Sequence, residues 1–158
     1  MFGRGAKSSS FGDNVEKEYQ DGEAIVIEGG REAEMFIIQE GSARVTKTIG
    51  GEEVELAVLG RGDFFGDMSL LESLPRSATV RALGTTRVQV IQPGGLMLKF
   101  RRDPSFAFEM LQRLSGRVRN INRILVETLE GKHGDHNNVR AEVGRAEYEF
   151  NNEHDDTT

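Results

Sequence analysis

The sequence predicts a mainly β fold, either a sandwich or a jelly-roll barrel, with α-helices at its C-terminal end. Short apolar runs recur between glycines over residues 19–92, and several alternate apolar with polar side chains, as strands with one buried face do. After residue 93 the apolar spacing changes to three and four residues, which is typical of a helix. This change of period separates a β part from a helical part.

A chain of 158 residues is in the range of one domain. Residues 1–13 are mostly Gly, Ser and charged side chains, which predicts a disordered arm. Residues 131–158 have little apolar periodicity and an excess of acidic residues, which predicts an acidic, flexible tail. We therefore expect one folded domain over residues 14–130, with the β part at 19–92 and the helices at 94–130.

Six strands are expected in the β part. The clearest is 54–59, where Val54, Leu56 and Val58 alternate with Glu55 and Ala57. The expected strands span residues 24–27, 35–38, 43–45, 54–59, 77–82 and 88–91. Turn signals separate them at Asp21-Gly22, Gly29-Gly30, Glu40-Gly41, Gly50-Gly51 and residues 60–63.

The C-terminal helical pattern begins near Pro104, where Asp103 or Ser105 can cap a helix, and Gly131 can end it. A break at Gly116 would give two helices, and without it the pattern predicts one long helix. Packing of the apolar seam on the β part is the simplest expectation, and a homodimer through this helix is the alternative. The seam consists of Leu111, Leu114, Val118, Ile121 and Leu125.

Composition argues against several functional classes. The chain has no cysteine, so it has no disulfide, thiolate nucleophile or cysteine zinc site. A net charge of −6 opposes a nucleic-acid backbone, so no DNA partner is expected. No stretch resembles a membrane span or a secretory signal, so we expect a cytoplasmic protein with no membrane partner. Because His133, His136 and His154 all lie in the predicted tail, no metal site is expected.

Residues 65–82, FGDMSLLESLPRSATVRA, combine three features that bind anions. Gly66 allows a tight backbone turn. The amides of the next segment point outward at the positive end of a short helix. Arg76 supplies a guanidinium, which can donate two hydrogen bonds to one phosphate. The segment therefore predicts a phosphate pocket.

This segment resembles the phosphate-binding cassette of the cyclic nucleotide-binding domain family, with Asp67 in place of the family's glutamate. Residues 21–29, 35–45 and 59–66 resemble other family segments in the same order, and the chain resembles a single-domain bacterial-type member related to the sensor domain of the catabolite activator protein. The resemblance implies a β-roll, that is, a double-stranded β-helix jelly-roll, followed by two or three α-helices. It also implies that the helical lead-in before the first strand is reduced to about residues 10–18.

The resemblance implies that the roll binds a cyclic nucleotide, with cAMP as the expected ligand and cGMP as the alternative, and needs no cofactor. Arg76 would bind the cyclic phosphate, and Asn122 and Arg123 would cover the base as a lid. The expected ligand-binding residues are Phe65, Gly66, Asp67, Met68, Ser69, Arg76, Ser77 and Ala78.

Two residues have alternative roles. Arg76 can instead form a surface pair with Asp63 or Glu72. Asp67 is shorter than glutamate by about 1.5 Å, so it either still contacts the ribose or caps the helix opened by Met68. Loss of the ribose contact would weaken binding by about 1 kcal/mol.

The resulting hypothesis is a regulatory sensor, not an enzyme, that transmits ligand occupancy to an unidentified effector protein by moving the helices after Pro93. The alternative is a scaffold domain that binds nucleotide weakly or not at all and mediates protein–protein interaction.

Overall fold

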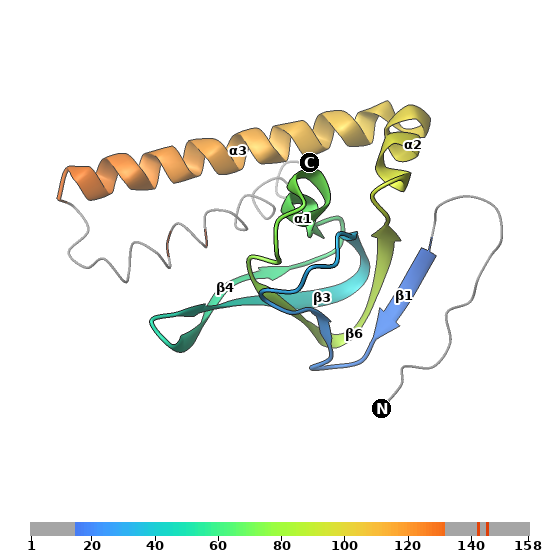
Figure 1. Cartoon of the computed structure of the whole chain (residues 1–158), viewed down its shortest axis with the longest axis horizontal. Helices are drawn as coiled ribbons and strands as arrows, with labels where there is room; N and C mark the ends of the chain where they lie inside the picture. The colour runs from blue at the N-terminus through green and yellow to red at the C-terminus, as the bar shows by residue number, and fades with distance from the viewer. Residues whose placement is uncertain (1–14, 132–141, 143–144, 146–158) are drawn as a thin grey trace, which may run out of the picture.

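The computed structural model describes residues 15–131, together with Glu142 and Arg145 (Figure 1). The predicted arm at 1–13 and nearly all of the predicted tail, including its three histidines, lie outside the described residues. In chain order the elements are β1 (Val15–Tyr19), β2 (Ala24–Val26), β3 (Met35–Ile49), β4 (Glu52–Leu59), β5 (Phe64–Phe65), α1 (Asp67–Glu72), β6 (Thr79–Ile91), α2 (Gly95–Arg102) and α3 (Pro104–Leu129).

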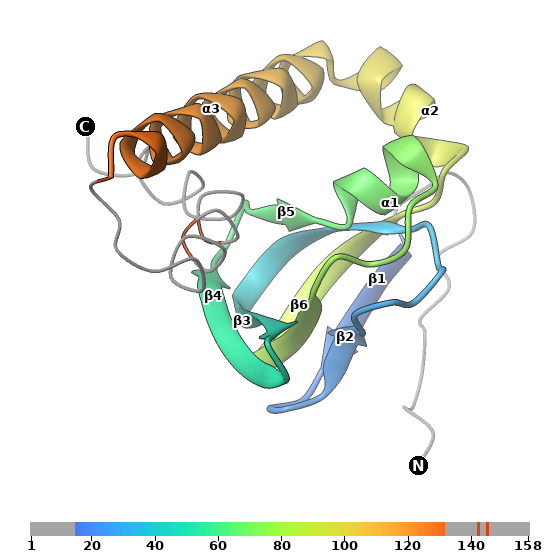
Figure 2. The same ribbon diagram turned by 60° about the vertical axis from the view of Figure 1, so that its left-hand side comes forward.

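The strands form one six-stranded antiparallel sheet in the order β1-β6-β3-β4, with β2 also on β6 and β5 also on β3. Figure 2 shows the sheet curling into a roll, with α1, α2 and α3 on the side of β5. The predicted mainly β fold followed by two or three α-helices is confirmed, with α2 and α3 as the helices after the last strand.

Two pairs of expected strands are each one long strand. The segments 35–38 and 43–45 both belong to β3, because the expected turn at Gly41 is a register shift within the strand, with φ of 82°. A Cβ at Gly41 would lie 2.5 Å from the carbonyl oxygen of Thr85, so the close pairing of β3 with β6 requires glycine there. The segments 77–82 and 88–91 likewise merge into β6, which begins at Thr79.

The expected helical lead-in at 10–18 is wrong for the part that the structure describes, because residues 15–19 form strand β1. This strand pairs with β6 from Val15 opposite Val90 to Tyr19 opposite Thr86. Its side chains are mostly exposed, and only Tyr19 packs against the core. Backbone pairing, rather than an apolar face, therefore determines its conformation.

The core has two parts, separated by the sheet. In β3, Phe36 and Ile38 belong to the cluster inside the roll, whereas Met35 and Ile37 belong to a second cluster with Leu96 of α2 and, from α3, Met110. Successive side chains of a strand point to opposite faces, so residues 35–38 of β3 are buried on both faces. The second cluster attaches the helices to the roll.

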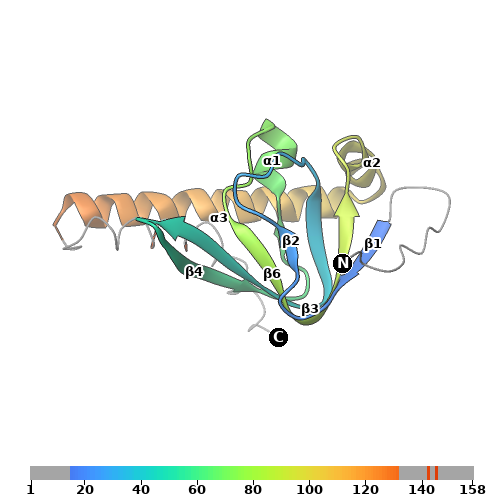
Figure 3. The same cartoon turned by 60° about the horizontal axis from the view of Figure 1, so that its bottom comes forward.

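Asp103 caps α3, since its Oδ1 accepts a hydrogen bond from the Phe106 amide over 3.2 Å. The helix continues through Gly116 without a break and ends at Leu129, before Gly131 with φ of 73°. Figure 3 shows α3 extending well past the roll, toward the β3–β4 hairpin. Among the described residues no helix is long and apolar enough to cross a membrane.

The expectation that the whole α3 seam packs on the roll is wrong. Leu111, Val118 and Leu125 are 65%, 57% and 52% exposed. Leu114 packs on the second cluster, beside the buried Met110. The helix thus carries two apolar faces, one on the roll and one in solvent.

Candidate functional site

The cassette begins at a turn that only glycine can make. Gly66 has φ of 81°, and a Cβ there would lie 2.7 Å from both Nη1 of Arg76 and the carbonyl oxygen of Glu34. The six-residue helix α1 follows and ends at Ser73, which is itself left-handed with φ of 55°. The segment returns to β6 through Arg76.

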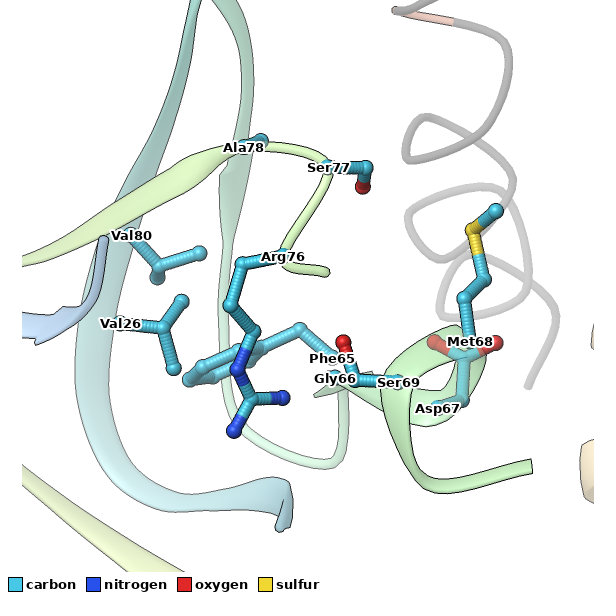
Figure 4. A pocket seen from close by; sticks show the side chains of 10 residues that line it. All are labelled: Val26, Phe65, Gly66, Asp67, Met68, Ser69, Arg76, Ser77, Ala78 and Val80. Carbon is cyan, nitrogen blue, oxygen red and sulfur yellow. The ribbon is translucent and has the colours of Figure 1, made fainter. Parts of the chain in front are cut away.

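All eight predicted ligand-binding residues line one hollow, together with Val26 and Val80 (Figure 4). The hollow has a volume of about 20 Å³, far below the roughly 300–1,000 Å³ of typical small-molecule sites. The structure therefore gathers the predicted residues around one hollow that is too small to enclose a whole nucleotide.

Arg76 is buried beneath this hollow and is only 4% exposed. Its Nη1 donates to the carbonyl oxygen of Glu34 over 2.6 Å, and its Nη2 lies 3.5 Å from the Glu34 carboxylate. Its Nε has no hydrogen-bond partner, and burial lowers the pKa of the guanidinium from its ordinary value. The expected alternative pairs with Asp63 or Glu72 are wrong, because the partner is Glu34. Such a buried cation is suited to receive an anion.

Arg76 also lines a second, larger cavity of about 440 Å³. The rest of its wall comes from β1, β2, the segment between β2 and β3, and Phe36 of β3, and it includes Tyr19 and Glu34. Nothing in the sequence pattern indicated this cavity.

Asp67 does not cap α1. The N-cap is Gly66, with no side-chain hydrogen bond, and the Asp67 carboxylate instead accepts a hydrogen bond from Nη1 of Arg117 over 2.9 Å. Both residues are buried, at 3% and 7% exposure. The capping alternative is wrong, and the structure adds Arg117 of α3 to the site. The only signal for Arg117 in the sequence was its spacing of four residues from Arg113, which places both arginines on one face of the helix.

Arg113 forms the neighbouring contact, with Nη1 3.1 Å from Oδ1 of Asp63. The other oxygen of Asp63 accepts from the Gly60 amide over 2.8 Å. Burial raises the pKa of Asp63, although the bonds from Gly60 and Arg113 act in the opposite direction. The ring of Phe64 lies beneath both guanidiniums, 5.8 Å from that of Arg113 and 5.1 Å from that of Arg117.

The predicted lid residues do not line the hollow. Asn122 and Arg123 are exposed on α3, and Arg123 donates to Asn120 over 2.8 Å and to Glu127 over 3.0 Å on the same helix. A lid role would require α3 to move toward the cassette.

Comparison with known proteins places this geometry in a family. Residues 16–103, more than half of the chain, match the family described as "Cyclic nucleotide-binding domain". A cAMP-dependent protein kinase regulatory subunit from Mycosarcoma maydis is 46% identical over 82 residues, which cover 51% of this chain and 16% of the relative. The chain spans 16% to 47% of the length of five curated relatives it matches.

Solved structures show the same fold. The regulatory domain of Toxoplasma gondii PKA, crystallised with cAMP, has a TM-score of 0.54 and 28% identity, covering 65% of this chain and 39% of that one. The catabolite activator protein of Thermus thermophilus has a TM-score of 0.54 and 25% identity, covering 83% of this chain and 72% of that one.

Proposed function

Because the chain belongs to the cyclic nucleotide-binding domain family, we propose that it is a regulatory sensor that binds cAMP in the 65–82 cassette and transmits occupancy through α3. The observation that carries the proposal is the buried Arg76 at the cassette, with an Nε that has no hydrogen-bond partner. The cyclic phosphate would supply the missing acceptor, and Ser77 and Ala78 lie beside it in the hollow.

The sugar would meet Asp67, whose carboxylate is held by Arg117 in this structure. A ribose hydroxyl and the Arg117 guanidinium are both donors, so they compete for the same carboxylate. Ligand entry would therefore weaken the contact between α1 and α3. This competition links the ligand to helix movement, and any lid role of Asn122 and Arg123 would follow from that movement.

Several relatives are named for cAMP, which supports cAMP as the ligand, and cGMP is the alternative ligand. The proposed role is regulatory, without catalysis or a cofactor, and the output passes to an effector protein. In the part of the chain that the structure describes, no group of acidic or histidine side chains is arranged to hold a metal ion.

The exposed stripe of α3 favours a homodimer as the route of output. Its side chains recur at spacings of three, four and seven residues, as in a two-stranded coiled coil. The stripe comprises Phe108, Leu111, Val118, Leu125 and Leu129. Two copies of α3, each about 39 Å long at 1.5 Å per residue, could pair along it.

A scaffold without nucleotide is the second candidate, and the small volume of the hollow favours it. Thermal unfolding separates the two. A ligand at 100 times its Kd stabilises the folded state by about 2.7 kcal/mol, which raises Tm by roughly 10 °C in a domain of this size. We expect this shift with cAMP, a much smaller one with 5′-AMP, and none in Arg76→Ala. If neither cAMP nor cGMP shifts the parent protein, and Arg76→Ala behaves identically, the scaffold is correct.

A further inference from the structure

We propose that Arg113 is a positioning residue that holds α3 on a fixed pivot at Asp63, while the adjacent ion pair between Arg117 and Asp67 is the one that the ligand breaks. This inference rests on the proposed function. It assigns different roles to two ion pairs that lie side by side on the same helix.

Asp63 is anchored to the roll and cannot follow the cassette. Its amide donates to the Gly60 carbonyl over 3.1 Å, and its own carbonyl accepts from the Ile38 amide of β3 over 2.9 Å. Its side chain is buried and accepts from both Gly60 and Arg113. Asp63 does not line the hollow. Ligand entry therefore leaves its ion pair with Arg113 in place.

Asp67 belongs to the part of the site that we expect to move when the ligand binds. It lies on α1, between the left-handed residues Gly66 and Ser73, and it lines the hollow. The hollow cannot enlarge unless its wall shifts, and α1 is the short segment of that wall between two turns. The carboxylate would move with α1 and leave Arg117.

The two arginines are one helical turn apart and both lie over the ring of Phe64, which is buried in the second core cluster. The ring gives α3 a fixed surface between the two ion pairs. With Arg113 held and Arg117 released, the distal part of α3 would swing about Asp63 rather than detach.

Binding thermodynamics test this division of roles. An ion pair that is present in both the free and the bound protein leaves Kd unchanged, whereas an ion pair that must break for the ligand to bind raises Kd. Calorimetry should give Arg113→Gln a Kd for cAMP within about twofold of the parent. Arg117→Gln should bind about tenfold more tightly, since one charge-assisted bond no longer competes. Arg119→Ala, on the same helix, is the control for removal of a charge and should match the parent.

The distance between α3 and the roll is the second measurement, because it reports directly whether Arg113 holds the helix in one position. Because the chain has no cysteine, spin labels can be attached to Glu53→Cys on β4 and to Val126→Cys in the last turn of α3, which is exposed and is not part of the stripe. The labelled protein is diluted with unlabelled protein. In the parent, cAMP should shift one narrow distance distribution to another. Arg113→Gln should broaden the distribution both without and with cAMP, and Arg113→Lys should partly restore it.

Two results would overturn the pivot. One is a change in the Kd of Arg113→Gln as large as that of Arg117→Gln, which would mean that both ion pairs break together. The other is an unchanged distance distribution in Arg113→Gln. If the parent itself binds no cyclic nucleotide, the proposed function fails, and the ligand-free distance distributions of the parent and Arg113→Gln still decide whether Arg113 positions α3.

Discussion

Nη1 of Arg117 lies 2.9 Å from Oδ2 of Asp67, and this buried ion pair joins α3 to the cassette across fifty residues of sequence. Its members come from the two segments whose relative movement the proposed function requires. Four residues earlier on α3, Arg113 makes the matching ion pair with Asp63. The helix is therefore held on the roll by charge as well as by the apolar packing of Met110 and Leu114.

Removing one member of the buried pair should destabilise the ligand-free protein. Arg117→Ala leaves the Asp67 carboxylate buried without its arginine, which typically costs about 3–5 kcal/mol. Urea unfolding of Arg117→Ala, Asp67→Ala and the double variant measures the coupling. We expect the double variant to lose clearly less than the sum of the two single variants. Additive losses would show that the two side chains do not interact in solution.

Replacing Asp67 with the longer glutamate should increase the preference for a ligand that carries the ribose 2′-hydroxyl. Asp67→Glu extends the side chain toward the ribose and should tighten cAMP binding by about 1 kcal/mol, several-fold to tenfold. The affinity for 2′-deoxy-cAMP should change little, because that ligand has no 2′-hydroxyl to donate the bond. Competition binding with both ligands gives the ratio. An equal gain for the two ligands would rule out a ribose contact at this position.

The stability contributed by Asp63 should depend on pH. Burial raises the folded-state pKa of Asp63 above the ordinary 3.8. The protonated side chain therefore adds to the free energy of unfolding below the unfolded-state pKa, and this added stability is lost as the pH rises through the folded-state pKa. Asp63→Asn cannot ionise. As the pH increases from about 3 to 7, the free energy of unfolding of Asp63→Asn should therefore rise relative to that of the parent. Denaturant unfolding across this range checks the slope, and a shift in the opposite direction would mean that the ion pair with Arg113 outweighs burial.

Charges on the exposed stripe of α3 should prevent dimerisation. Leu111→Glu combined with Leu125→Glu places like charges along the proposed interface, whereas Met97→Glu alters an equally exposed apolar side chain on α2. Light scattering after size exclusion should find a dimer for the parent and for Met97→Glu, and a monomer for the double variant. A parent that is monomeric at all concentrations would exclude the dimer as the route of output.

Much of the fold could be predicted because local patterns determine it. The strand 54–59 alternates, and β4 is the strand Glu52–Leu59. Asp103 precedes Pro104 and caps the helix as its residue type predicts. Strand β1 could not be predicted in this way, since its side chains are mostly exposed and its conformation depends on pairing with a segment about seventy residues later.

In the site too, local features could be predicted from the sequence and long-range contacts could not. The cassette residues lie within fourteen positions of one another, so their grouping followed from a local motif. The roles of Glu34, Arg113 and Arg117 depend on contacts over 42 to 50 residues of sequence. The local sequence at Asp67 is compatible with a helix cap, and only the approach of Arg117 on α3 shows that the carboxylate forms an ion pair instead.

Calorimetric titration of cAMP into the parent and into Arg76→Lys decides whether the cassette binds a cyclic phosphate through Arg76. Lysine keeps the positive charge but loses the planar pair of donors. We expect saturable one-site binding to the parent, weakened about 10- to 100-fold in Arg76→Lys and unchanged in Arg81→Lys, an exposed control on β6. Equal affinities of the parent and Arg76→Lys, or no binding to the parent, would refute nucleotide recognition by Arg76.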